Sequence, residues 1–259
     1  MKKYMIILFP LIIISFLASC EFFSRPMYTL SRDIVGTIGS MSTEDLAGNI
    51  DKFSSDPEKV ADVLSELADR DQDEVKKLPR DEKEKLLEAG VGAILPTSQL
   101  GETVDQLTSG EGEKDYKKIM DTLTSNSPDV DTKALETVLG DEDVLENTDA
   151  TTLTLGAASL ITNTIKKEGG DEKMDAFQEA VKGATTGGTF DESTFKKQLE
   201  EKGFSADSVS ALTTAMNTTS VLTGTAGEGK PNRKEDTEKI SVGGFSLGGL
   251  LDDLTGKES

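Results

Sequence analysis

The chain has 259 residues, of which 48 are acidic and 28 are basic, so that its formal net charge at pH 7 is −20. Such a charge disfavours binding to nucleic acid or to anionic lipid headgroups. The sequence contains no histidine, which excludes Ser-His-Asp and Cys-His catalysis as well as zinc and haem sites built on histidine.

The N-terminal segment has the pattern of an export signal. Lys2 and Lys3 precede an apolar run from Met5 to Leu17. This run is shorter than the roughly 20 apolar residues that a membrane-spanning helix needs. It is followed by small residues and then by Cys20, the one cysteine in the chain. We therefore predict a signal peptide over residues 1–19 rather than a membrane span or a core segment.

The end of this segment, Leu17-Ala18-Ser19-Cys20, resembles the lipobox of bacterial lipoproteins. The resemblance implies cleavage between Ser19 and Cys20, diacylglycerol on the Cys20 thiol and acylation of the new α-amine. Two or more acyl chains anchor a protein stably, because each buried CH₂ contributes about 0.8 kcal/mol. The implied location is the bacterial envelope, at the inner or the outer membrane, with the protein in the periplasm or at the cell surface. The relaxed lipobox and low aromatic content resemble those of spirochaete lipoproteins, and no family is identified for the mature domain.

Residues 20–29 are predicted to be a tether, and residues 30–223 an all-α domain, an irregular bundle or array of many short helices. A polar N-cap often lies between two apolar residues that pack together across the first helical turn. This pattern occurs at Met41-Ser42 with Leu46, Val130-Asp131 with Leu135, Phe190-Asp191 with Phe195, and Phe204-Ser205 with Val209. Asp56-Pro57 marks a further start, with proline at the first helical position.

Apolar spacing predicts one buried face on several of these helices. The clearest stripe consists of Val60, Val63, Leu64, Leu67 and Ala68. Two others are Tyr116, Ile119, Met120 and Leu123, and Val209, Leu212, Ala215 and Met216.

Two uncharged segments, 150–165 and 209–223, are rich in Ala, Thr and Ser. An uncharged helix is usually buried on most faces, so we predict that both lie at the centre of the C-terminal half and pack on each other. Their Thr and Asn content argues against a membrane span. Their similarity hints at a duplicated helical unit, without the fixed period of a known helical repeat.

Residues 224–259 are predicted to be a Gly-rich linker and a flexible tail, because apolar periodicity stops at Gly224. Apolar residues return between 240 and 254. The alternative function of this stretch is to dock a partner or a groove of the domain itself.

The linker contains a fragment of a nucleotide-binding motif. "GTAGEGK" (224–230) matches the first seven positions of a P-loop, but the eighth is Pro231 instead of Ser or Thr. Neither a preceding strand nor a following helix is predicted, so a linker explains the glycines better.

Two other fragments are also incomplete. Asp69, Asp71 and Asp73 have the alternate spacing of the first three ligands of an EF-hand calcium loop. The glycine and the final glutamate of such a loop are missing here. This stretch is better explained as a turn between helices, which leaves weak cation binding open. Ser193 and Lys196 have the Ser-x-x-Lys spacing of penicillin-binding enzymes, without their partner motifs.

These observations favour a non-enzymatic envelope lipoprotein that is held at the membrane by Cys20 and acts through an unidentified protein partner or as a structural component. We predict no catalytic residue, cofactor or metal site. The alternative is a carrier of lipid or another hydrophobic ligand between the two Thr/Ala-rich helices. An enzyme using Asp, Glu, Ser or Lys would need carboxylates that converge in a cleft.

Overall fold

The computed structural model describes residues 38–95, 128–186, 189–227, 229–238, 241–242 and 245–246. Two units divide the chain, Met1–Ser40 and Met41–Ser259. The described part of the first is the 3-10 helix η2 (Ile38–Ser40). The predicted signal peptide, the tether, Cys20 and the stripe that begins at Tyr116 lie outside the described residues.

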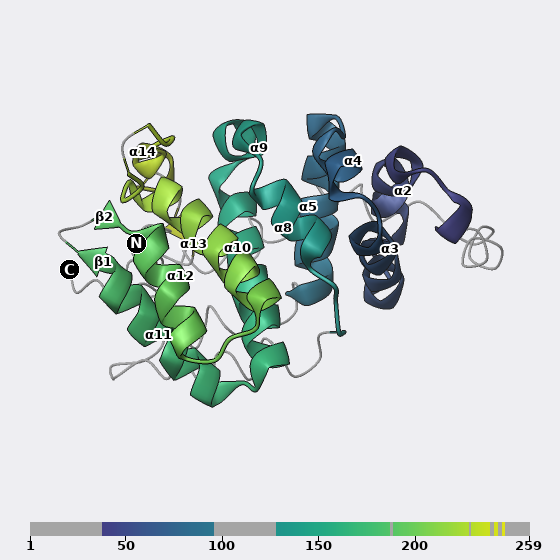
Figure 1. Ribbon diagram of the computed structural model, residues 1–259. Coiled ribbons are helices and arrows are strands. Elements are labelled where there is room, and N and C mark those ends of the chain that lie inside the picture. The colour runs from purple at the N-terminus through teal and green to yellow at the C-terminus, as the bar shows by residue number, and fades with distance from the viewer. Residues whose placement is uncertain are drawn as a thin grey trace, which may run out of the picture. The chain divides into compact units, whose positions relative to one another are not determined.

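The described part of the second unit is predominantly helical, which confirms the all-α prediction (Figure 1). Its first helices are α2 (Thr43–Asn49), η3 (Ile50–Phe53), α3 (Pro57–Asp69), α4 (Gln72–Lys76) and α5 (Arg80–Ile94). After residue 128 come α8 (Lys133–Leu139), α9 (Glu142–Asn147), α10 (Ala150–Glu168), α11 (Asp171–Ala184), α12 (Glu192–Glu201), α13 (Ala206–Thr223) and α14 (Lys234–Glu238). Two-residue antiparallel ladders join β1 (Thr185–Thr186) to β2 (Thr189–Phe190) and β3 (Ser241–Val242) to β4 (Phe245–Ser246).

Helix starts follow the predicted caps closely. Four predicted N-caps are confirmed, because the side chain of each accepts a hydrogen bond from the backbone N–H three residues later. They are Ser42, Asp56, Asp191 and Ser205. The predicted cap Asp131 is displaced by one residue, because its carboxylate accepts from Lys133 N at 3.0 Å and the helix begins after Thr132. Such side-chain bonds satisfy N–H groups that have no partner within the helix.

The helices are held together by buried apolar faces. The predicted stripe of α3 is buried along its whole length, as is that of α13. Helix α10 packs against both α5 and α13, and α8 contacts α3, α5, α10 and α13. At Gly156 of α10, a Cβ atom would lie 2.7 Å from Leu87 Cδ1 and 3.2 Å from Leu139 Cδ2. The absence of a side chain therefore allows two leucines to reach the backbone of α10.

Two pairs of a short and a long helix, α4 with α5 and α9 with α10, share a spacing. Asp71 caps α4 and Pro79 precedes α5, while Asp141 caps α9 and Asp149 caps α10. The interval is eight residues in both cases (79 − 71 and 149 − 141). In both pairs, the long helix therefore begins eight residues after the short one. The two long helices, α5 and α10, contact each other.

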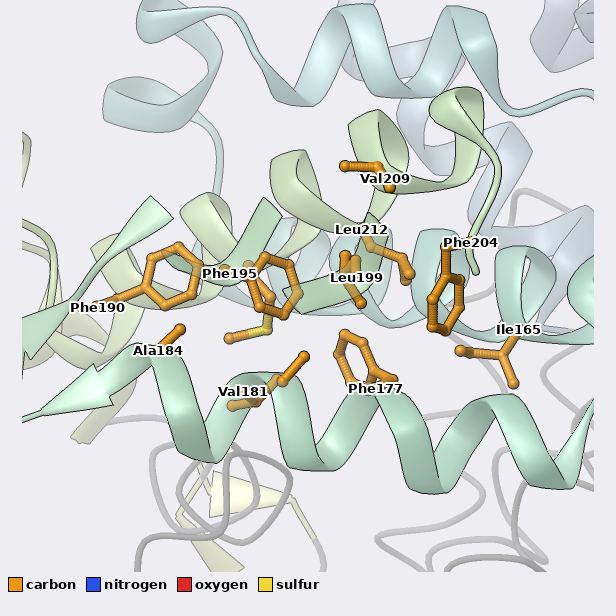
Figure 2. Close-up of a cluster of buried hydrophobic side chains, with 12 residues drawn as sticks. Ile165, Phe177, Val181, Ala184, Phe190, Phe195, Leu199, Phe204, Val209 and Leu212 are labelled. Carbon is orange, nitrogen blue, oxygen red and sulfur yellow. The ribbon is translucent and has the colours of Figure 1, made fainter. Parts of the chain in front are cut away.

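A cluster of aromatic and aliphatic side chains joins α11, α12 and α13 (Figure 2). Phe195 of α12 lies at its centre and is fully buried. Its ring makes edge contacts with Phe177, at 6.0 Å between centroids, and with Phe190, at 5.3 Å. Edge-to-face packing of this kind adds to the free energy of area burial.

The two uncharged segments form α10 and α13, and they pack on each other as predicted. Several of their buried hydroxyls donate to the backbone of their own helix. Thr154 donates to Ala150 O at 2.7 Å, and Thr213 donates to Val209 O at 2.6 Å. These polar side chains are buried at low cost because the carbonyl one turn earlier satisfies them.

Candidate functional site

The site predicted with most detail, Ser19 and Cys20, lies outside the described residues. Within residues 38–95 and the described stretches after residue 127, no helix combines the length and apolar character needed to cross a membrane. Attachment of this protein to a membrane through Cys20 therefore stays a prediction.

The P-loop fragment does not have the geometry of a phosphate site. Gly224 ends α13 in the left-handed conformation, with φ of 69°. Lys230 N donates to Gly227 O in a turn, and the Lys230 side chain is exposed. The fragment thus follows a helix, whereas a P-loop follows a β-strand.

The two other fragments have local structural roles. Asp71 is the N-cap of α4 and accepts from Asp73 N at 3.0 Å, while Asp69 is the last residue of α3. Among the described residues there is no group of three His, Cys, Asp or Glu side chains placed to hold a metal ion. Ser193 lies in the first turn of α12, and Lys196 forms an ion pair with Glu192.

One carboxylate lies where α2 meets α5. Glu82 Oε2 is buried and has no hydrogen-bond partner among the described residues, and Glu82 Oε1 lies 3.5 Å from the position of a Cβ on Gly48. Burial, followed by the charges of Glu44 and Asp81, raises the pKa of Glu82. The side chain as a whole is only partly buried. It therefore resists ionisation.

A buried ion pair joins α5 to the start of α9. The side chain of Lys83 is 7% exposed, and its Nζ lies 2.7 Å from Asp141 Oδ2. Asp141 Oδ1 accepts a hydrogen bond from Asp143 N at the start of α9, and Asp141 is thereby the N-cap of that helix. One carboxylate thus neutralises a buried ammonium group and satisfies a helix terminus, which is a structural role.

A partly buried glutamate joins α8 to α13. The hydroxyl of Ser210 donates to Glu136 Oε1. Burial raises the pKa of Glu136, the bond from Ser210 opposes this, and the charge of Asp207 raises it further. Through the bond from Ser210, this carboxylate links α8 to α13.

A polar junction gathers the ends of α10, α11, α12 and α13. Glu168 accepts from Ser205 N at 3.0 Å, and its Oε2 lies 3.9 Å from Lys173 Nζ. Burial alone would raise the pKa of Glu168, but hydrogen bonds from Ser205 and Ser208 outweigh it and leave the pKa lowered. Lys173 donates to Gly203 O at 2.7 Å and lies 4.5 Å above the centre of the Phe204 ring. This junction neutralises helix ends with opposite charges.

The segment after α13 also contacts the helical domain. We call residues 224–238 the C-terminal strap. Its Arg233 donates through Nη1 to Leu145 O at 3.0 Å and to Thr148 O, and through Nε to Asp236 Oδ2 at 2.9 Å. The sequence predicted only a linker here, because Arg233 binds residues 85 and 88 positions away, which no local pattern connects to it.

The arrangement of these polar groups can link helices, but it does not assemble a nucleophile, a base and a stabilising group at one place. Glu82, Lys83, Glu136 and Arg233 were not singled out in the sequence, since a buried charge is recognised only once its environment is known. Comparison with protein-family models, with curated proteins and with solved structures gave no match for this chain.

Proposed function

We propose that this protein is a membrane-anchored envelope lipoprotein that acts as a non-enzymatic interaction or structural protein. The lipobox-like Leu17-Ala18-Ser19-Cys20 carries the anchoring part of the proposal. Lipid on Cys20 would hold the acidic helical domain at the membrane surface, and the predicted tether would set its distance from it.

One observation supports the interaction or structural role. The buried and partly buried charges described above lie where helices meet, and Lys83 with Asp141 is the clearest case. These contacts hold the helices together, and the net charge of −20 gives the chain an acidic character that would steer oppositely charged protein partners.

The carrier function is the weaker candidate. It needs apolar space between α10 and α13, but these helices are in direct contact. Ser159 of α10 is buried, and its hydroxyl has no hydrogen-bond partner among the described residues, so that it suits an apolar ligand poorly.

Anchoring is tested by metabolic labelling with a palmitate analogue in a bacterial host. The wild-type chain should be labelled and should fractionate with membranes, whereas Cys20→Ala should be unlabelled. Ser24→Ala, close to the same site, is the control and should behave as wild type. Equal labelling of wild type and Cys20→Ala would sink the anchoring proposal.

The interaction role is tested by cross-linking the full lipidated chain in intact cells. We expect the same protein to be recovered repeatedly by mass spectrometry. Recovery of a stoichiometric lipid from the purified protein, without any cross-linked protein, would favour the carrier function.

A further inference from the structure

The C-terminal strap is fastened at two ends. Near its start, Thr225 O accepts a hydrogen bond from Phe190 N of β2 at 3.0 Å. Near its other end, Arg233 N donates to Val221 O at 2.9 Å, and the Arg233 guanidinium reaches the last carbonyls of α9. The strap therefore runs from β2 to the C-terminal end of α9, and Figure 1 shows α14 beside the end of α13.

These fastenings are polar. Among strap residues whose burial is described, none is fully buried, whereas most of α13 is. Lys230 adds a charge interaction: the pKa of Glu192 is lowered chiefly by hydrogen bonds from Lys196 and Asn217, and also by the charge of Lys230. A segment held by hydrogen bonds with little apolar burial opens at a lower free energy than a core helix.

Arg233 is the strongest of these fastenings. Its side chain is 15% exposed, so its bonds are shielded from water, and a charged donor makes stronger hydrogen bonds than a neutral one. The two carbonyls that it binds end α9, where a cation also meets the negative end of the helix dipole. The other bonds of the strap to α13 include backbone bonds from Thr225 N and Ala226 N to Ser220 O and a hydrogen bond between the hydroxyls of Thr223 and Thr225.

We propose that the C-terminal strap opens as a unit while the helical domain stays folded, and that Arg233 is the latch that holds it closed. Opening would separate α14 from α10 and α13, which it contacts when closed. It would thereby uncover the parts of both helices that α14 contacts.

The test is hydrogen–deuterium exchange, followed by mass spectrometry, on the full chain purified with its lipid in detergent. In the wild type, amides of 224–238 should exchange faster than those of α13. Arg233→Ala should accelerate exchange in the strap about ten-fold or more, because charged hydrogen bonds are lost. The Phe190 amide is a second reporter, since its acceptor belongs to the strap. Arg233→Lys, which retains the charge without the planar fork, should give an intermediate rate.

The matched control is Glu235→Ala, an exposed position on α14, which should leave strap exchange unchanged. Circular dichroism should show equal helicity for all variants. The proposal is overturned if Arg233→Ala leaves the strap as protected as in the wild type. It is also overturned if that variant accelerates exchange equally in α13 and the strap, because the strap would then be part of the cooperative core. Neither result depends on a partner, so both are distinguishable from failure of the proposed interaction.

Discussion

Two glycines of α5 provide a matched test of packing. Gly90 is buried, and a Cβ there would lie 2.6 Å from Leu135 Cδ2 and 2.7 Å from Leu135 Cδ1. Leu135 is 1% exposed, so its methyl groups cannot move into solvent. Gly92 lies two residues further along the same helix and is exposed, and a Cβ there would have no neighbouring atom within 4 Å among the described residues. The same substitution therefore meets opposite environments.

The expected free energies have opposite signs. Replacing glycine by alanine inside a helix stabilises it by about 1 kcal/mol. Gly92→Ala should gain this amount in full. Gly90→Ala gains the same propensity but must displace the Leu135 side chain, and overpacking costs about 1–3 kcal/mol. We expect Gly90→Ala to be about 2 kcal/mol less stable than Gly92→Ala, and no more stable than the wild type.

The assay is urea unfolding followed by far-ultraviolet circular dichroism, with both variants and the wild type at the same pH. The slope of unfolding free energy with urea should be equal in all three, so that midpoints can be compared. A Gly90→Ala variant as stable as Gly92→Ala would refute the close approach of α5 to α8.

Three further changes test other parts of the structure by the same assay. Lys83→Met should lower the free energy of unfolding by about 3 kcal/mol, because it leaves the Asp141 carboxylate beside a buried apolar chain; a loss below about 0.5 kcal/mol would contradict a buried pair. Glu82→Gln should stabilise the protein at pH 7, since the raised pKa of Glu82 means that its ionisation opposes folding. The gain in unfolding free energy should vanish as the pH falls below about 4, where the wild-type carboxyl is protonated. A difference between variant and wild type that does not depend on pH would count against this cause. Phe195→Ala should cost about 3–5 kcal/mol, as expected for a buried ring, and a mild effect would contradict the tight packing of this ring in the cluster of Figure 2.

Local signals in the sequence predicted the helix starts well. Ser42, Asp191 and Ser205 could be recognised because a cap and its hydrophobic staple involve residues within one turn. Asp56 could be recognised because proline follows it at the first helical position. The one displaced cap, Asp131, shows the precision of such signals, since an Asp can accept from either the second or the third following N–H.

Interactions between distant segments could not be predicted in this way. The Lys83–Asp141 pair joins residues 58 positions apart, and the bond from Arg233 to Leu145 joins residues 88 positions apart. Neither has a periodicity or a spacing that distinguishes it from an exposed charge. For the same reason, residues 224–238 resembled a linker until their contacts with α9 and α13 were known.

The hydroxyl groups of α10 and α13 have a consequence for how these helices recognise each other. Because Thr154, Thr213 and Thr219 donate to their own helix, these hydroxyls require no acceptor on the neighbouring helix. At these positions the alignment of the two helices depends on shape and not on directional bonds. Valine has nearly the shape of threonine, so the interface could exchange one for the other during evolution while keeping its geometry.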